Sequence, residues 1–194
     1  MINYKKIFKH NRAWAKDMRE NNPGFFKKHF QKQQPDFLYI GCSDSRVSVE
    51  KLMGVDIGEV FVHRNIANIV SPDDENILAV IQYAVDVLKV KNIVVAGHTG
   101  CGGIKASLCE HSHGSMDRWL GKIKDVYIKN EAHLQKIENE PKMLDEFSRI
   151  NVIEQCHHLA KLPCVLESKI KTGYPQIHAW MYDMSNGHLI DLEL

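Results

Sequence analysis

The sequence predicts an α/β fold: a mainly parallel β-sheet flanked by helices, with an N-terminal helical arm and a C-terminal β-hairpin. Three short apolar runs, at 37–41, 59–64 and 92–97, are rich in β-branched or aromatic residues and are bounded by glycine or polar residues, as buried strands are. A helical pattern lies between the second and third runs. A strand, a helix and a strand within roughly forty residues form a βαβ unit, whose strands run parallel.

The helix between the second and third strands is expected to begin at Ser71. Serine is a good N-cap, Pro72 suits the first helical position, and the acidic residues 73–75 complement the positive end of the helix dipole. One apolar face follows at helical spacing, formed by Ile77, Ile81, Ala84, Val85 and Leu88. This face predicts that the helix packs on the sheet.

The N-terminal segment predicts an amphipathic helical arm over residues 1–30 that packs on a partner subunit. Its apolar side carries Ile7, Trp14 and Met18. The sequence shows no internal repeat, low-complexity tract or linker. We therefore expect a single domain that spans residues 1–194, with the arm as part of it.

The second half of the chain predicts more helices and a final hairpin. The polar segment 115–158 has helical character, with a break at Pro141. Pro163 is expected to open a further helix that ends near Gly173. The turn signal at 185–187, Ser-Asn-Gly, lies between two short apolar runs and predicts a β-hairpin.

The composition excludes several classes of partner. Lysine and arginine number 25 against 24 acidic residues, and a net charge of +1 favours neither nucleic acid nor an acidic surface. No run approaches the ~18 apolar residues of a membrane span, and the N-terminus lacks the apolar core of a secretory signal. The five cysteines are an odd number, which favours reduced thiols in a cytoplasmic protein.

Cysteine and histidine residues follow two of the predicted strands. Cys42 ends the first apolar run, in YIGCSDSRV, and His98 and Cys101 follow the third, in GHTGCGG. The carboxyl ends of parallel strands meet at one edge of a sheet, where sites commonly form. Two thiols and an imidazole in a reducing compartment are typical of zinc ligation. Three protein ligands leave a fourth position for water, as in catalytic zinc sites.

Simpler interpretations exist for each motif alone. A lone cysteine is often core filler, and a structural zinc site would take a fourth ligand, which the Cys109, His111 and His113 cluster offers. A redox site would need C-x-x-C, which the sequence lacks. A cysteine phosphatase would need a longer loop than the one between Cys42 and Arg46. The two strand-end motifs together favour a catalytic metal site.

The pair of motifs, C-S-D-S-R at 42–46 and H-T-G-C-G-G at 98–103, resembles the signature of the β-class carbonic anhydrases of the bacterial type. The resemblance extends through FVHRNIAN at 61–68 and IQYAVDVLKVKNIVVAGH at 81–98, and it covers most of the chain. It implies a zinc-dependent lyase that hydrates carbon dioxide reversibly to bicarbonate and a proton. It also implies one Zn²⁺ per chain and a homodimer or a larger oligomer such as a homotetramer.

The resemblance also implies roles for single residues. Cys42, His98 and Cys101 correspond to the zinc ligands. Asp44 and Arg46 correspond to the catalytic pair, with Asp44 as a fourth ligand in a closed state of the site. The substrate pocket, which the family builds across a dimer interface, corresponds to Gln33, Phe61, Ile66, Tyr83 and Gly102.

The charge of the three zinc ligands explains why the site would need Asp44 and Arg46. Zinc with two thiolates and a neutral imidazole has no net charge, so its water ionises less readily than at a three-histidine site, where the pKa is about 7. Asp44 can accept a hydrogen bond from that water, and Arg46 can hold the carboxylate in a two-pronged ion pair. The implied reaction is attack of zinc-bound hydroxide on carbon dioxide.

Some relatives have a closed state with a regulatory bicarbonate site formed by a tryptophan, an arginine and a tyrosine. Arg64 and Tyr182 match two of these positions, whereas Tyr39 stands in place of the tryptophan.

Two other functions stay open on this fold. One is hydrolysis of a similar substrate such as carbon disulfide or carbonyl sulfide, and the other is a catalytically inactive zinc-stabilised binding protein. The intact Asp44 and Arg46 argue against the second.

Overall fold

The computed structural model describes residues 3–112 and 114–194. The chain divides into two compact units, of which the first ends at Gln34 and the second spans Pro35–Leu194. The first unit holds helices α1 (Tyr4–Asn21) and α2 (Phe25–Gln31), as the sequence predicts for a helical arm. Trp14 makes edge-on contacts with the rings of Phe25 and Phe26, yet no residue of either helix is fully buried.

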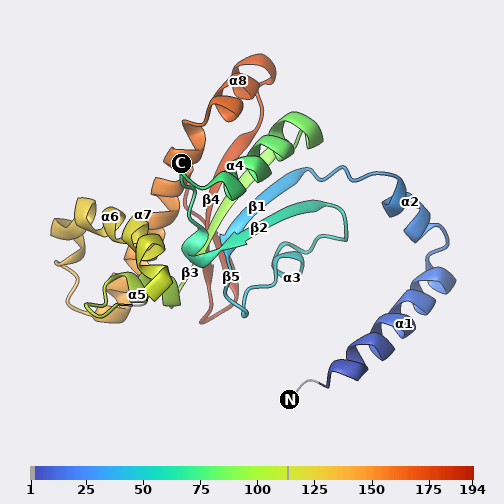
Figure 1. Ribbon diagram of the computed structural model, residues 1–194, viewed down its shortest axis with the longest axis horizontal. Helices are drawn as coiled ribbons and strands as arrows, with labels where there is room; N and C mark the ends of the chain where they lie inside the picture. Colours follow the sequence, from blue (N-terminus) through green and yellow to red (C-terminus); the bar gives the residue numbers. More distant parts are fainter. Residues whose placement is uncertain (1–2, 113) are drawn as a thin grey trace. The chain divides into compact units, whose positions relative to one another are not determined.

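The second unit is built on a five-stranded sheet in the order β2-β1-β3-β4-β5 (Figure 1). The strands are β1 (Phe37–Cys42), β2 (Val60–Asn65), β3 (Asn92–His98), β4 (Gln176–Asp183) and β5 (His188–Asp191). The first four run parallel, and β5 pairs antiparallel with β4. The α/β class, the mainly parallel sheet and the terminal hairpin are thus confirmed.

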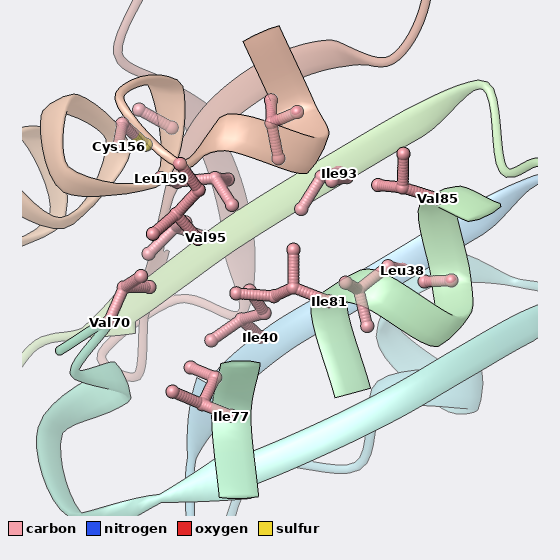
Figure 2. Close-up of a cluster of buried hydrophobic side chains, with 14 of the residues drawn as sticks. Leu38, Ile40, Val70, Ile77, Ile81, Val85, Ile93, Val95, Cys156 and Leu159 are labelled. Carbon is pink, nitrogen blue, oxygen red and sulfur yellow. The ribbon is translucent and has the colours of Figure 1, made fainter. Parts of the chain in front are cut away.

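One face of the sheet is covered by α4 (Glu75–Gln82), which continues as a π-helical turn, and by α7 (Glu140–Ala160) and α8 (Pro163–Thr172). Figure 2 shows side chains of this cover meeting those of β1 and β3. The labelled residues, each at most 2% exposed, are Leu38, Ile40, Val70, Ile77, Ile81, Val85, Ile93, Val95, Cys156 and Leu159. Burial of aliphatic groups of this size contributes about 1.5–3 kcal/mol per side chain and fixes the sheet under its helices.

The predicted start of α4 is wrong. The helix begins at Glu75 rather than near Pro72, and Asp74 is its N-cap, accepting the Asn76 N–H at 3.1 Å. The Ser71 hydroxyl instead contacts Asp73 and accepts a hydrogen bond from Lys122 of α6 (Asp117–Leu134) at 2.8 Å. Aspartate caps a helix as well as serine does, and a partner distant in sequence engages the serine.

The other predicted helix boundaries agree with the structure. Pro141 lies in the first turn of α7, so it separates α6 from α7 as expected. Helix α8 begins at Pro163 and ends before Gly173, whose φ of 79° is the left-handed conformation common after helices. In the described part of the chain, no helix is both long and apolar enough to cross a membrane.

The carboxyl ends of β1, β2 and β3 lead into a second buried cluster. Helix α5 (Gly102–Ser107), the short 3₁₀ turn Ile66–Asn68 and α6 contribute to it, and it includes Cys42 and Cys101. Figure 1 shows α5 and α6 beside this end of the sheet. The opposite face of the sheet carries α3 (Val49–Met53). The candidate site therefore lies in a packed region at the strand ends.

Candidate metal centre

Three side chains converge at the carboxyl edge of the sheet. Cys42 is the last residue of β1, His98 is the last residue of β3, and Cys101 is the N-cap of α5. Their ligand atoms all lie within 4.8 Å of one another, and the two Sγ atoms are 3.9 Å apart. Each side chain is buried. Among residues 3–112 and 114–194, no other group of three or more His, Cys, Asp or Glu residues is arranged to hold a metal ion.

The His98 ring is oriented for ligation. Its Nδ1 lies 2.9 Å from the Thr99 carbonyl oxygen, so Nδ1–H donates and Nε2 carries the lone pair. Nε2 is buried and has no hydrogen-bond partner in the described part of the chain. An unpaired buried polar atom costs about 1–3 kcal/mol, and a metal ion at this position would remove that penalty.

The two thiols influence each other's ionisation. The hydrogen bond from Cys101 lowers the pKa of Cys42 well below its usual range, and the same contact raises the pKa of Cys101 well above its own. Two adjacent thiolates repel each other, which a cation between them would offset. Two thiolates and an imidazole form a soft donor set that suits a thiophilic divalent metal, so the residues present fit such an ion.

The turn after β2 supports Cys42. The backbone of Ala67 approaches the Cys42 thiolate and helps to lower its pKa. Ala67 adopts a left-handed conformation with φ of 63°, which is unfavourable for a residue with a Cβ. Two side-chain amides hold it there. Asn65 accepts the Ile69 N–H at 2.8 Å, and Asn151 of α7 donates to the Ala67 carbonyl at 3.0 Å. No local pattern in the sequence predicts these two contacts.

Asp44 and Arg46 form a two-pronged ion pair. Arg46 Nε lies 2.9 Å from Asp44 Oδ1, and Arg46 Nη2 lies 2.7 Å from Oδ2. The pair holds the pKa of Asp44 well below its usual range. Oδ2 also lies 3.8 Å from His98 Nε2. An ionised carboxylate therefore stands beside the three ligand atoms.

Arg64 fixes the backbone of the same segment. Its Nε donates to the Cys42 carbonyl at 2.8 Å, and its Nη2 donates to the Asp44 carbonyl at 2.6 Å. Tyr39 is buried on the neighbouring strand, which raises its pKa to about 12, and the Arg64 charge partly opposes this rise. Tyr182 lies on β4, which β1 and β3 separate from the strand of Arg64. The structure thus places Tyr39 near Arg64, and Tyr182 on a more distant strand.

A pocket of about 300 Å³ opens beside Cys42 and Asp44. Ile66 and Gly102, both predicted, lie on its wall. Ala106, Met116 and Leu120 complete an apolar lining that the sequence analysis missed. Leu120 lies on the buried face of α6, which its helical spacing indicates, but no local signal connects it to the site.

Two of the other predicted pocket residues, Phe61 and Tyr83, do not line this pocket. Phe61 and Tyr83 contact each other, with ring centroids 5.9 Å apart, and Gln33 belongs to the first unit. The alternative ligand cluster is not tested as a whole, because His113 lies outside the described residues. Of its other members, Cys109 donates to the Lys105 carbonyl at 3.7 Å.

Comparison with known proteins agrees with this geometry. Residues 37–189 match the family model described as carbonic anhydrase. A carbonic anhydrase of Emericella nidulans is 45% identical over 189 residues, which are 97% of this chain and 83% of that protein. One of Candida albicans is 38% identical over 191 residues, or 96% and 67% of the two chains. A tetrameric β-carbonic anhydrase of Sordaria macrospora superposes with a TM-score of 0.94 at 38% identity, covering 98% of this chain and 97% of that one.

Replacement of Gly103 by alanine is expected to destabilise the site region. A Cβ at Gly103 would lie 2.5 Å from Cγ2 of Ile66 and 3.3 Å from Cβ of Ala67. Overpacking of this kind costs about 1–3 kcal/mol, so the free energy of unfolding measured in urea should fall by that amount.

Gly121→Ala, on α6, is the matched control. Its added methyl group meets no atom within 4 Å, and alanine in a helix interior is favoured over glycine by about 1 kcal/mol. This variant should be as stable as the parent protein or more stable. An unchanged free energy of unfolding for Gly103→Ala would contradict the close packing of α5 on the turn after β2.

Proposed function

The chain belongs to the β-class carbonic anhydrases, and we propose that it hydrates carbon dioxide with one zinc ion held by Cys42, His98 and Cys101. The observation that carries the zinc assignment is the buried, unpaired Nε2 of His98 facing two thiols. A structural metal would need no carboxylate beside it. The ionised Asp44 at this position therefore supports a catalytic role for the ion.

Zinc, when bound, supplies a Lewis acid that lowers the pKa of a coordinated water. The protein side chains supply orientation. Asp44, which Arg46 keeps ionised, accepts a hydrogen bond from the attacking water. This hydrogen bond orients the water so that a lone pair of the water oxygen points towards the substrate. Arg46 holds the carboxylate in one orientation through two parallel hydrogen bonds, which a single-point contact could not do.

The pocket beside Asp44 suits the substrate. Carbon dioxide is small and has no net dipole, and the walls formed by Ile66, Ala106, Met116 and Leu120 are apolar. The product is an anion that such walls do not retain. We infer that bicarbonate leaves through this pocket, and that the proton passes to buffer.

Metal content and carbon dioxide hydration, measured on the same preparations, test the proposal. The parent protein should contain one zinc per chain and hydrate carbon dioxide in stopped-flow assays. Cys42→Ser should lose zinc and activity, because a hydroxyl is a poor zinc ligand. Asp44→Asn should keep zinc and lose activity on the order of a hundredfold, because the water loses the carboxylate that orients it.

Cys164→Ser is the control, since this thiol lies on α8 outside the ligand group. It should keep both zinc and activity. A protein that binds zinc but shows no hydration at any pH up to about 9 would overturn the function. Full activity in Asp44→Asn would overturn only the role of the carboxylate.

We also propose regulation by bicarbonate through Tyr39, Arg64 and Tyr182. The supporting contact is that of Arg64 with the carbonyls of Cys42 and Asp44. An anion that draws Arg64 away would release this segment. Asp44 could then leave Arg46 and become a fourth metal ligand, which would close the site.

Hydration rates measured from about pH 6.5 to about 9, with and without added bicarbonate, test this regulation. We expect activity to fall towards the acid end and to fall further when bicarbonate is present. Arg64→Lys should be less active without bicarbonate and should respond less to it, because an ammonium group cannot make both carbonyl contacts in the same geometry. A profile of the parent protein that does not respond to bicarbonate would contradict the regulatory site.

We further propose that the protein is a homo-oligomer, at least a dimer. The second unit exposes Val62, Ile66, Tyr83 and Val87, with 37–60% of each side chain accessible. Phe61 and Tyr83, which the family resemblance assigns to the substrate pocket, contact each other and do not line the pocket of their own chain. They could complete the pocket of a partner. In the helical arm, Tyr4, Phe8 and Phe30 are exposed and available to pack on a second subunit.

Light scattering coupled to size-exclusion chromatography tests the assembly. The mass of one chain is 22.3 kDa, and the parent protein should have a mass of at least two chains. Val87→Lys places a charge on the exposed apolar surface, so the mass should decrease and hydration activity should decrease with it. A fully active parent protein with the mass of one chain would contradict the proposal.

A further inference from the structure

The two-residue loop Thr99-Gly100 joins two of the three ligands. Thr99 is held by β4 and the turn after it, because its N–H donates to the Tyr182 carbonyl and its Oγ1 accepts the Met184 N–H, both at 3.0 Å. The Thr99 carbonyl in turn accepts from Nδ1 of His98. The conformation of this loop therefore determines how the His98 ring is held.

Both backbone polar groups of Gly100 form hydrogen bonds with side chains. Its φ of 62° is left-handed, a conformation that glycine adopts readily. Its N–H donates to Oδ1 of Asp145, on α7, at 2.8 Å. Its carbonyl accepts from Nη2 of Arg46 at 3.3 Å. One glycine thus connects a carboxylate on a distant helix to the arginine of the Asp44–Arg46 pair.

Few contacts fix the orientation of the Arg46 side chain. Its side chain is 60% exposed, and its guanidinium donates only to Asp44 and to the Gly100 carbonyl among the described residues. A long exposed side chain has many rotamers, so each fixed acceptor matters for its orientation. Displacement of the Gly100 carbonyl would loosen the arginine, and with it the carboxylate of Asp44.

We propose that Asp145 is a positioning residue for the carbonic anhydrase reaction, acting through Gly100 on Arg46 and on the loop that carries His98 and Cys101. A carboxylate that accepts a backbone N–H forms a charge-assisted hydrogen bond, which is stronger than a neutral one. Without Asp145, the Gly100 N–H loses its partner and the loop can rotate. This inference rests on the function proposed above.

Asp145 has no evident role in its own helix. The N-cap of α7 is Asn139, which accepts the Lys142 N–H at 3.0 Å, and Asp145 lies beyond the first turn. In the part of the chain that the structure describes, the Gly100 N–H is the only hydrogen-bond partner of its side chain. The carboxylate therefore serves the loop rather than the helix.

Asp145 also does not touch the substrate pocket. It lines a separate pocket of about 390 Å³ together with Arg46, Lys105 and Glu140. The two pockets share only Gly102 among their lining residues. A change at Asp145 should therefore act on the rate of the reaction through geometry, and not on access of the substrate.

Steady-state kinetics of zinc-loaded Asp145→Ala, Asp145→Asn and Glu140→Gln test the proposal. We expect Asp145→Ala to lower kcat on the order of tenfold and to change KM less than about twofold, because small misplacements of catalytic groups reduce the rate of the chemical step. Asp145→Asn keeps an acceptor oxygen and should retain most of the activity. Glu140→Gln removes a charge from the same pocket without touching the loop, so it should behave like the parent protein.

Two further measurements separate positioning from a general structural effect. In an Arg46→Ala background, or in Arg46→Lys if alanine leaves too little activity, Asp145→Ala should lower kcat by a smaller factor than it does in the parent protein, because one of the two groups through which Asp145 acts is absent. Amide hydrogen exchange of the peptide at 98–104 should be faster in Asp145→Ala and unchanged in Asp145→Asn. This exchange measurement does not depend on any substrate.

The inference is overturned if Asp145→Ala matches the parent in kcat, if its loss is equally large in the Arg46 background, or if exchange at 98–104 does not change. It is also overturned if Asp145→Asn is as impaired as Asp145→Ala. A parent protein that fails to hydrate carbon dioxide would refute the proposed function. In that case hydrogen exchange would still decide whether Asp145 holds the loop.

Discussion

The candidate metal centre depends on the register between β1 and β3. Gly41 pairs with Ala96, so Cys42 and His98 end their strands at the same edge and reach each other. A shift of one residue in this pairing would move one of the two Cα atoms by about 3.3 Å along the strand direction and change the distance between the two ligands. The register is fixed by the buried aliphatic residues of both strands, which pack under α4 and α7 (Figure 2). The stability of the hydrophobic core and the geometry of the metal centre therefore have the same origin.

The turns that follow these strands depend on particular residues. Ala67 has a positive φ that a residue with a Cβ does not favour, whereas Gly100 adopts the left-handed conformation readily, and Gly103 leaves no room for a Cβ against Ile66. Strained backbone of the kind seen at Ala67 costs of order 1–3 kcal/mol and persists where the surroundings impose it. Here the surroundings are side chains of α7, Asn151 at one turn and Asp145 at the other. Helix α7 thus covers the sheet and also shapes the site.

The charges at the site are arranged around the expected position of the metal. Two thiolates and the Asp44 carboxylate would place three negative charges close together, and Arg46 and Arg64 bring positive charge to the same segment. A divalent cation offsets the excess, which explains why the residues that would bind it are buried rather than solvated. Arg46 acts on the carboxylate and Arg64 on the backbone that carries it. The two arginines therefore have distinct effects on the same segment.

The sequence by itself determined the strands, the fold class and the residues that converge at the strand ends. Local patterns were sufficient for this, because buried strands are apolar runs and the ends of parallel strands share an edge. Asp44 and Arg46 are two residues apart, so their pairing was also predictable. Only the tertiary structure decided the contacts between distant segments: Lys122 with Ser71, Met116 and Leu120 at the pocket, and Asp145 with Gly100. Each of these contacts joins groups whose own neighbours in the sequence carry no signal of the partner, so only the packing of the folded chain brings them together.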